Sequence, residues 1–309
     1  MRRRDFIPAT ASAASLLLNP AWSAETRRPN VLFVLADQWR PLTLTANLRR
    51  LTEAGTTFTR CYATNPAMAP SRTSILTGCY PHVRPAERPP LTKQLESAGY
   101  ATGSAKVAPF FLLAEIGSGA DDALGEHLDA VPGDTLVVFT ADRGNMLGAH
   151  GLGGDGWPFE ESVRVPLIIR YPGRFRSGEV DDLLMSNADI MPSLLSLCGA
   201  EIPATVQGRD LSRTMISGEG ERPESVYSYG RIGEPGEWRM LVRGLDKLVV
   251  NTKMEATHLY NLGQDPGETR NLATEIGWAR NRAELKAHLR AWMKKTGDGL
   301  DPSSGLKVR

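Results

Sequence analysis

Three apolar runs along the chain have the length and composition of buried strands. They cover residues 30–36, 135–141 and 165–171, and an aspartate directly follows each of the first two, Asp37 and Asp142. Apolar runs without alternation are typical of strands that helices cover on both faces, as in a parallel sheet. Ligands of such sheets bind at the carboxyl ends of the strands. The pattern therefore predicts an α/β fold with Asp37 and Asp142 at its ligand-binding edge.

Helical spacing of apolar residues separates and follows these strands. The predicted helices cover residues 46–54, 91–98, 111–130 and 190–198. Glycines directly after the first two and the last are expected to end those helices, because glycine readily adopts the left-handed conformation at a helix C-terminus. Asn187 or Asp189 is the expected N-cap of the last helix. Strands that alternate with helices in this way indicate a mostly parallel sheet flanked by helices.

The pattern changes after about residue 220. Short alternating segments separated by Gly and Pro, as in an antiparallel sheet, occur at residues 225–229, 239–243 and 247–250. Residues 275–295 have the spacing of an amphipathic helix. The residues expected on its inner face are Ile276, Ala279, Leu285, Leu289 and Trp292. We therefore predict an α/β domain over residues 25–220 and a small C-terminal subdomain, an antiparallel sheet plus a helix, over residues 221–309.

The first 24 residues have the features of an export signal. The pair Arg3-Arg4 resembles a twin-arginine signal, and small and apolar residues then lead to a small-x-small cleavage pattern at residues 21–24. The apolar stretch is far shorter than the roughly 20 residues that a membrane-spanning helix needs. We predict a twin-arginine signal peptide over residues 1–24, and a periplasmic or extracellular protein without stable membrane insertion after signal removal. The alternative is a basic N-terminus on a cytosolic protein.

Composition narrows the class of protein without naming a reaction. The chain has 309 residues, with 36 Lys and Arg against 35 Asp and Glu, and 41% of its residues are hydrophobic. The balanced charge provides no bulk field for nucleic acid or anionic lipid. Three cysteines, Cys61, Cys79 and Cys198, allow one disulfide at most and match no CxxC zinc pattern. These values exclude a disordered chain, a disulfide scaffold and a polytopic membrane protein.

Longer segments carry a family resemblance. They read PNVLFVLADQWR at residues 29–40, NPAMAPSRTSILTGCYPH at 65–82, VVFTADRGNMLGAHGL at 137–152, FEESVRVPLIIRYP at 159–172 and YNLGQDPGETRNL at 260–272. In this order they resemble the sulfatase family, part of the alkaline-phosphatase-like superfamily. The resemblance implies a mostly parallel sheet flanked by helices with a small C-terminal antiparallel sheet, and the hydrolysis of sulfuric esters at a divalent-metal site.

A sulfatase site has to hold an anion and stabilise the charge that builds on the leaving oxygen. In the family, the cysteine of a C-x-P-S-R motif is oxidised to formylglycine, whose hydrated aldehyde attacks sulfur, and carboxylates at strand ends hold Ca²⁺, which prefers oxygen ligands. The resemblance assigns metal-ligand positions to Asp37, Gln38 and Asp142. It assigns Arg72 to the arginine that steadies the nucleophile and Lys106 to a sulfate-binding lysine, so both are expected to contact substrate.

The sequence departs from the family at positions that carry its chemistry. Met68 stands where the modified cysteine belongs, and a thioether cannot become formylglycine. Arg143 stands at a family metal-ligand position, and Asp155 replaces a sulfate-binding lysine. We expect Met68 to pack into the former nucleophile position. The reciprocal charge changes predict an ion pair between Arg143 and Asp155 in a pocket that has lost calcium.

Two hypotheses on function remain open. The first is a sulfuric ester hydrolase impaired by the loss of its nucleophile, with any residual hydrolysis through a metal-bound hydroxide or Ser71. The second is a non-catalytic sulfatase-like protein that binds sulfated glycans or other anions. Both imply a sulfated small molecule or glycan as partner, and no nucleic acid. The alternatives at single residues are a helix-bracing role for Arg72, a solvated position for Lys106, and structural roles for His82 and His150.

Overall fold

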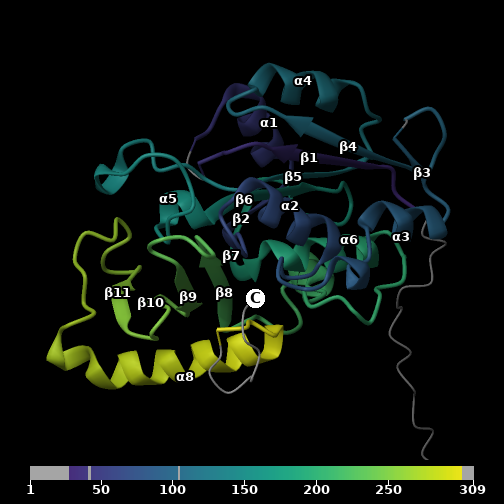
Figure 1. Cartoon of the computed structure of the whole chain (residues 1–309). Helices are drawn as coiled ribbons and strands as arrows, with labels where there is room; N and C mark the ends of the chain where they lie inside the picture. The colour runs from purple at the N-terminus through teal and green to yellow at the C-terminus, as the bar shows by residue number, and fades with distance from the viewer. Residues whose placement is uncertain (1–27, 41–42, 104, 301–309) are drawn as a thin grey trace, which may run out of the picture.

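The computed structural model describes residues 28–40, 43–103 and 105–300 (Figure 1). The predicted signal peptide, residues 1–24, lies outside the described residues. Within the described ranges, no helix combines the length and hydropathy that crossing a bilayer requires.

The larger of two sheets has seven strands in the order β3-β4-β1-β5-β6-β2-β7. In that order the strands are β3 (Ala101–Thr102), β4 (Phe110–Ile116), β1 (Val31–Ala36), β5 (Leu136–Ala141), β6 (Arg164–Arg170), β2 (Thr56–Tyr62) and β7 (Glu179–Ser186). All neighbours are parallel except β6, which is antiparallel to both β5 and β2. Every residue of β1 and β5 is buried, as the unbroken apolar runs predicted. The mostly parallel α/β fold is therefore confirmed.

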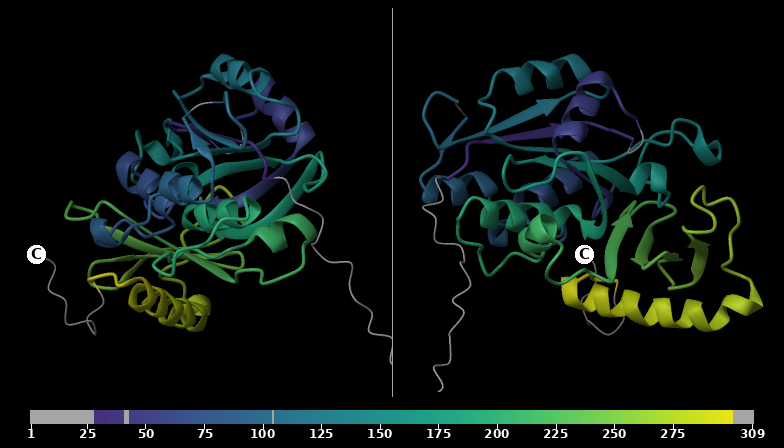
Figure 2. Two further views of the ribbon diagram at one scale, coloured as in Figure 1. Left: turned by 90° about the vertical axis from the view of Figure 1, so that its right-hand side faces the viewer. Right: turned by 180° about the vertical axis from the view of Figure 1, so that it is seen from behind.

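Helices cover both faces of this sheet (Figures 1 and 2). Those of the α/β domain are α1 (Ala46–Ala54), α2 (Met68–Thr77), α3 (Leu91–Ser97), α4 (Asp121–Asp129), α5 (Glu160–Val163), α6 (Ile190–Leu197) and α7 (Ser212–Ser217). The pair α1 and α4 lies on one face, and α2, α3 and α6 lie on the other. The sheet is therefore enclosed between helices, which explains why its central strands carry no polar alternation.

One predicted helix is wrong, and one predicted helix cap is confirmed by position. The stretch 111–130 is not one helix, because its first seven residues lie within or next to β4, between β1 and β3, and α4 begins only at Asp121. A short apolar run has the same pattern in a buried strand and a buried helix. Asp189 is the N-cap residue of α6, as predicted, although its side chain makes no capping hydrogen bond to that helix. Its carboxylate instead accepts the N–H of Ser186, whose hydroxyl accepts the N–H of Ala188. This capping box belongs to the 3₁₀ turn that leads into α6.

The second sheet is antiparallel, in the order β11-β10-β9-β8, and one long helix covers it. Its elements are β8 (Ser225–Gly230), β9 (Trp238–Arg243), β10 (Asp246–Asn251), β11 (Ala256–Asn261) and α8 (Ala279–Thr296). Leu285, Leu289 and Met293 form the buried stripe of α8. The inward positions predicted for Ile276 and Ala279 are wrong: Ile276 is 91% exposed, in a 3₁₀ turn before the helix, and Ala279 is exposed at its first position.

The two sheets are joined by contacts that link β8 and β10 to the α/β domain. The hydroxyl of Ser228 donates to the carbonyl of Ala63 at 2.7 Å, and the N–H of Tyr229 donates to the carbonyl of Thr64 at 3.0 Å. Lys247 of β10 makes a buried ion pair with Glu160 of α5. The smaller sheet is thus fixed against the segment between β2 and α2.

Candidate active site

The carboxyl ends of β1 and β5 place two aspartates side by side. Ala36 pairs with Ala141 in the parallel register, so Asp37 and Asp142 leave the sheet at the same level. The N–H of Asp37 donates to Ile116 of β4, and the N–H of Asp142 donates to Ala36, so both aspartates are anchored by the backbone. Asp142 is fully buried, whereas the side chain of Asp37 is partly exposed.

Gln38 is the third predicted metal ligand, but its side-chain amide oxygen faces Asn145 instead of a shared metal position with the two aspartates. Its backbone has φ of 54°, in the left-handed region, and its N–H donates to Asp142 Oδ1 at 3.3 Å. Its side-chain Oε1 accepts a hydrogen bond of 2.5 Å from Asn145 Nδ2. The oxygen that a metal ion would use therefore already has a donor.

Arg143 places its guanidinium between the two aspartates. Its Nη1 lies 2.8 Å from Asp37 Oδ1 and 2.7 Å from Asp142 Oδ1, and its Nε donates to Asp155. The predicted contact between Arg143 and Asp155 is confirmed. Burial opposes the charged form of Arg143, but the negative charges of Asp142, Asp155 and Asp37 outweigh that effect and raise its pKa. The side chain therefore stays a cation.

Arg72 reaches the other side of Asp142 from α2. Its Nε donates to Asp142 Oδ2 at 2.8 Å, and its Nη1 lies 2.8 Å from Glu115 Oε2 on β4. Burial opposes the charged form here too, and the hydrogen bond and charge of Asp142 overcome it, so the pKa of Arg72 is raised. Arg72 thus braces α2 against β4 and β5, and two carboxylates share its positive charge.

The N-terminal turn of α2 carries the position of the family nucleophile. Met68 is its first residue, and 44% of its surface is exposed. The expectation that Met68 packs into the former nucleophile position is therefore wrong, because its side chain lies at the surface rather than among the core residues. Ser71, one turn further, is fully buried: its hydroxyl donates to the carbonyl of Asp142 and accepts from Asn187 Nδ2 at 2.8 Å.

The residues at the strand ends do not fit the calcium ion that the family implies. Calcium takes six to eight oxygen ligands at about 2.3–2.6 Å. The nearest oxygens of Asp37 and Asp142 both face Arg143 Nη1, and the amide oxygen of Gln38 faces Asn145. A divalent cation bound to these oxygens would meet a guanidinium at contact distance. The donor set therefore favours the guanidinium over the metal.

Lys106 is not brought to this edge. It is an exposed residue of the turn that precedes β4, whereas Asp37 is held at the last residue of β4, Ile116. A seven-residue strand spans about 20 Å. Lys106 precedes the first residue of β4, so it lies at the opposite ends of the strands from Asp37. The predicted sulfate contact of Lys106 is not supported by this placement.

The two histidines singled out from the sequence also lie elsewhere. The ring of His82 lies 2.6 Å, through Nε2, from the carbonyl of Thr296 and contacts the hydroxyl of Tyr229, which agrees with a structural role. The ring of His150 stacks on Phe159 with ring centroids 4.0 Å apart. Its Nε2 lies 3.6 Å from Glu161 Oε2.

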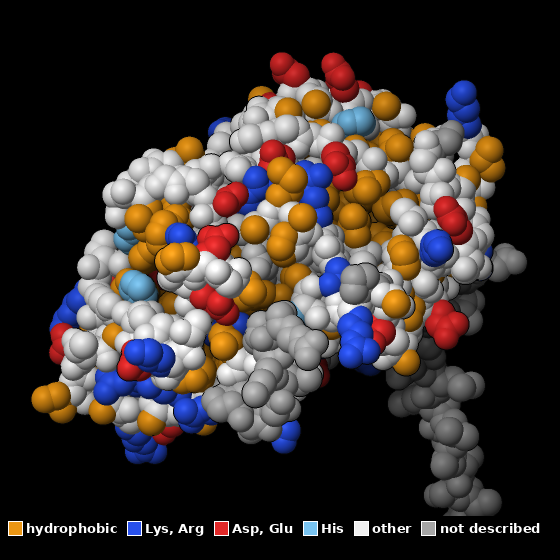
Figure 3. All heavy atoms as spheres, viewed as in Figure 1, with side chains coloured by type: hydrophobic (Ala, Val, Ile, Leu, Met, Phe, Trp, Pro, Cys, Tyr) orange, Lys and Arg blue, Asp and Glu red, His pale blue; other side chains and the backbone are white. Residues whose placement is uncertain are grey.

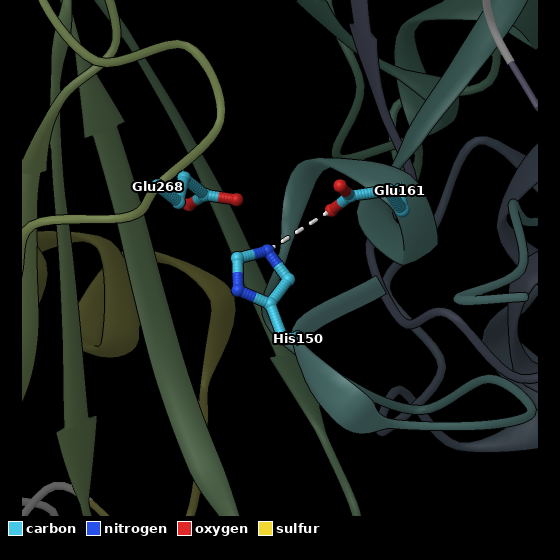
Figure 4. Close-up of side chains that lie close together, drawn as sticks. All are labelled: His150, Glu161 and Glu268. Atoms are coloured by element: carbon cyan, nitrogen blue, oxygen red, sulfur yellow. Dashed lines mark ion pairs between the residues drawn. The ribbon is translucent and has the colours of Figure 1, made fainter. Parts of the chain in front are cut away.

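His150, Glu161 and Glu268 offer ligand atoms within 4.8 Å of one another (Figure 4). They come from the loop after β5, from α5 and from the loop after β11. Both oxygens of Glu268 already have partners, since Oε1 lies 2.7 Å from Lys247 Nζ and Oε2 accepts the N–H of Glu160 at 2.7 Å. A metal ion here would compete with a buried ammonium group, so this cluster is only a weak candidate.

A cavity of about 860 Å³ opens beside the strand-end site. It lies where the start of α2, with Pro70, meets β8 and the loop that carries Asp155 and Trp157. The guanidinium of Arg231 lies over the Trp157 ring at 4.5 Å. Its charged lining groups are Asp155, Glu234, Glu237, Asp298, Arg231 and Arg239, and the ring of His82 also lines it. On the face shown in Figure 3, basic and acidic side chains are likewise interspersed.

Sequence reasoning missed Glu115 and Asn145, and it considered Asn187 only as a helix cap. Glu115 was inside a stretch interpreted as helix, although an acid near the carboxyl end of an apolar run is the same signal that identified Asp37 and Asp142. Asn145 and Asn187 act through hydrogen bonds to Gln38 and Ser71, and nothing in their local sequence indicates those partners.

Comparison with known proteins relates the chain to one family. The family model described as Sulfatase matches residues 29–111, and that described as N-sulphoglucosamine sulphohydrolase, C-terminal, matches residues 148–295. An N-acetylglucosamine-6-O-sulfatase of Bacteroides thetaiotaomicron is 29% identical over 179 residues, 55% of this chain and 32% of that protein. An arylsulfatase of Clostridium perfringens is 30% identical over 142 residues, 45% of this chain and 29% of that protein. The matched stretches thus span about a third of these relatives.

Solved structures show the same fold. A protein in complex with its substrate D-glucosamine-2-N,6-O-disulfate has a TM-score of 0.78 at 16% identity, over 91% of this chain and 100% of that one. A phosphonate monoester hydrolase of Agrobacterium radiobacter has a TM-score of 0.75 at 18% identity, over 86% and 96%. The two family models, the relatives and the shared architecture agree. The chain belongs to the sulfatase family and has its alkaline-phosphatase-like fold.

Proposed function

We propose that this protein keeps the scaffold of the sulfuric ester hydrolases but lacks ordinary sulfatase turnover. The observation that carries the proposal is Met68, an exposed thioether at the first position of α2, where the family has its formylglycine precursor. A thioether has no ionisable proton and cannot yield the hydrated aldehyde that attacks sulfur. We therefore expect the site to descend from a sulfatase site without catalysing sulfate ester hydrolysis at an ordinary rate.

No neighbouring side chain in the described structure is placed to replace the nucleophile. The Ser71 hydroxyl is buried and held by Asp142 and Asn187, so it would have to break both hydrogen bonds to attack a substrate. Cys61 and Cys79 are buried, and burial raises the pKa of both thiols, which keeps them protonated at neutral pH. Residual hydrolysis through Ser71 is therefore expected to be negligible.

The cationic side of the site is also changed. Asp142 and Glu115 share the charge of Arg72, and Asp37, Asp142 and Asp155 surround Arg143. Each guanidinium has its charge balanced by protein carboxylates rather than directed at an incoming anion. A sulfate group would gain less from these arginines than from the uncompensated cations that a sulfatase site requires.

The experiment compares hydrolysis of a chromogenic aryl sulfate by the wild-type protein and by Met68→Cys, each co-expressed with a formylglycine-generating enzyme. We expect no wild-type turnover above a Met68→Ala control, and no aldehyde-bearing residue in its mass spectrum. Wild-type turnover that disappears on chelation of divalent ions would refute the proposal. Hydrolysis by Met68→Cys alone would locate the loss at this one position.

The second candidate function is ligand binding without turnover, and the 860 Å³ cavity favours it. Of the charged groups that line it, four are carboxylates and two are arginines. Because carboxylates outnumber arginines here, we expect an uncharged sugar ring that contacts Trp157 as the ligand, in place of a sulfated or other anionic ligand. Because one relative is an N-acetylglucosamine-6-O-sulfatase, calorimetry with N-acetylglucosamine and its 6-sulfate tests this. We expect the 6-sulfate to bind no tighter, and Trp157→Ala to bind neither. Stronger binding of the sulfated sugar by tenfold would restore the anion hypothesis.

We further propose export as the setting of this protein, based on the twin-arginine pattern of residues 1–24. The test is the N-terminus of the protein recovered from the periplasm or medium of a host with a twin-arginine translocase. A mature chain that starts at residue 25, and its loss when Arg3 and Arg4 are both changed to Lys, are the expected results. Equal recovery of the double variant would contradict the proposal.

A further inference from the structure

Three carboxylates from separate segments surround the guanidinium of Arg143. Asp37 follows β1, Asp142 follows β5, and Asp155 lies in the loop before α5. Arg143 Nη1 contacts the first two at 2.8 and 2.7 Å, and Nε donates to the third. The side chain is 5% exposed. One buried cation therefore cross-links the ends of β1 and β5, which are distant in sequence, and the loop that follows β5.

The backbone holds Arg143 in this position. Its carbonyl accepts the N–H of Trp39 at 2.9 Å, and the next residue, Gly144, donates its N–H to Ser162 at 3.0 Å. A Cβ on Gly144 would lie 1.9 Å from the carbonyl oxygen of Glu161. This close approach of two backbone segments limits how the chain at Arg143 can move. The guanidinium is therefore built into the site rather than a flexible surface group that swings across it.

Both oxygens of the buried carboxylate are satisfied without any ion. Asp142 Oδ1 faces Arg143 at 2.7 Å, and Oδ2 accepts from Arg72 Nε at 2.8 Å. A fully buried carboxylate with only one partner would be costly, and here each oxygen has its own guanidinium. Two arginines of the chain therefore stabilise the negative charge of Asp142 without a bound ion.

We infer that the Arg143 guanidinium takes the place of the divalent metal ion at this strand-end site, as a cation supplied by the chain. It pairs with Asp37 and Asp142 and joins β1 to β5, and it excludes calcium from the same oxygens by charge and by volume. The site is therefore a metal-independent structural centre. This inference concerns cation binding and holds whether or not the nucleophile position can support turnover.

The test uses the full mature chain after treatment with EDTA, with calorimetry and thermal melts in CaCl₂, MgCl₂ and MnCl₂. For the wild type we expect no heat of binding and no rise in melting temperature with any of the three salts. For Arg143→Asn we expect a lower melting temperature without metal, because Asp142 loses one of its two cations. Calcium is expected to raise that temperature in a concentration-dependent way, with one ion bound per chain.

Two matched variants locate the effect. Arg143→Lys keeps the positive charge and is expected to show no calcium response, although its single ammonium group replaces a fork of donors less well. Adding Asp37→Asn to Arg143→Asn is expected to abolish the calcium response, because it removes one ligand oxygen charge. Wild-type calcium binding that Asp37→Asn abolishes would overturn the inference. So would a folded Arg143→Asn that gains no calcium response; if that variant does not fold, the wild-type titration decides.

Discussion

Lys247 offers a sharp test of what holds the two sheets together. It lies on β10, fully buried, with its Nζ 3.0 Å from Glu160 Oε1 and 2.7 Å from Glu268 Oε1. Glu160 belongs to α5 of the α/β domain, so the ammonium group joins that domain to the C-terminal subdomain. Burial opposes its charge, but the charges of the two glutamates outweigh burial and raise the pKa of Lys247. The perturbation is Lys247→Met, which keeps an unbranched side chain and removes the charge.

The size of the effect follows from these distances. With an effective dielectric constant of about 20, each contact provides roughly 5–6 kcal/mol of Coulomb attraction, which the desolvation of three buried ions largely offsets. Removing one partner of a buried pair typically costs about 3–5 kcal/mol, because the remaining charges stay buried without compensation. Two glutamates would be left here, and Tyr62 continues to donate to one of them, Glu160, at 3.0 Å. We expect a loss of about 4 kcal/mol in the free energy of unfolding.

The pH dependence has a definite sign. Because the pKa of Lys247 is raised in the folded state, its contribution to stability is complete below the ordinary lysine pKa and is lost as pH rises through the higher folded value. On the alkaline side, the stability deficit of Lys247→Met is therefore expected to shrink only in strongly alkaline solution. Burial also raises the pKa of Glu268, so without Lys247 this acid should take up a proton as pH falls. The deficit should thus also narrow on acidification.

The assay is urea unfolding at pH 7, followed by tryptophan fluorescence and by circular dichroism. Arg213→Met is the control, because Arg213 pairs with Glu219 at 3.2 Å with side chains 74% and 70% exposed; its expected change is within about 0.5 kcal/mol. A loss in Lys247→Met no larger than that of the control would refute the reasoning. Changing Glu160 and Glu268 to Gln as well should recover part of the loss.

Two further predictions concern the backbone beside the site and the thiols. Gly144→Ala is expected to lower the free energy of unfolding by about 3 kcal/mol or more, because the new Cβ would lie 1.9 Å from the carbonyl oxygen of Glu161. The control Gly133→Ala, with no atom within 4 Å of its Cβ, should leave the melting temperature nearly unchanged. Equal melting temperatures of the two variants would contradict this prediction. Burial raises the pKa of all three thiols, to about 12 for Cys198, so Ellman's reagent should label none at pH 8 in the folded protein and all three in guanidinium. The free cysteines are Cys61, Cys79 and Cys198. Rapid labelling of the native protein would contradict their burial.

Local pattern was enough to predict most of the fold. The runs that became β1, β5 and β6 were unbroken because helices cover both faces of the sheet, and residues 46–54 became α1 without change. Pattern failed at residues 110–116, because a seven-residue apolar run does not distinguish a strand from a helix. Pairing with the neighbouring strands β1 and β3 makes this segment a strand, β4. The buried face of α8 was predicted to begin at Ile276, but Ile276 lies in the 3₁₀ turn before the helix, and the buried face runs from Leu285 to Met293. The chain packs on the smaller sheet only after that turn.

The sequence by itself determined which acids end the central strands and that Met68 stands at the nucleophile position, because both follow from the order of residues along one segment. The reciprocal charge changes also predicted the Arg143–Asp155 pair, whereas only the tertiary structure placed Asp37 beside Arg143 and left Lys106 at the opposite ends of the strands. It also placed Met68 at the surface. Burial of a strand is a property of its own side chains, whereas the partners of a charged group depend on strand order and register, which join residues about a hundred positions apart.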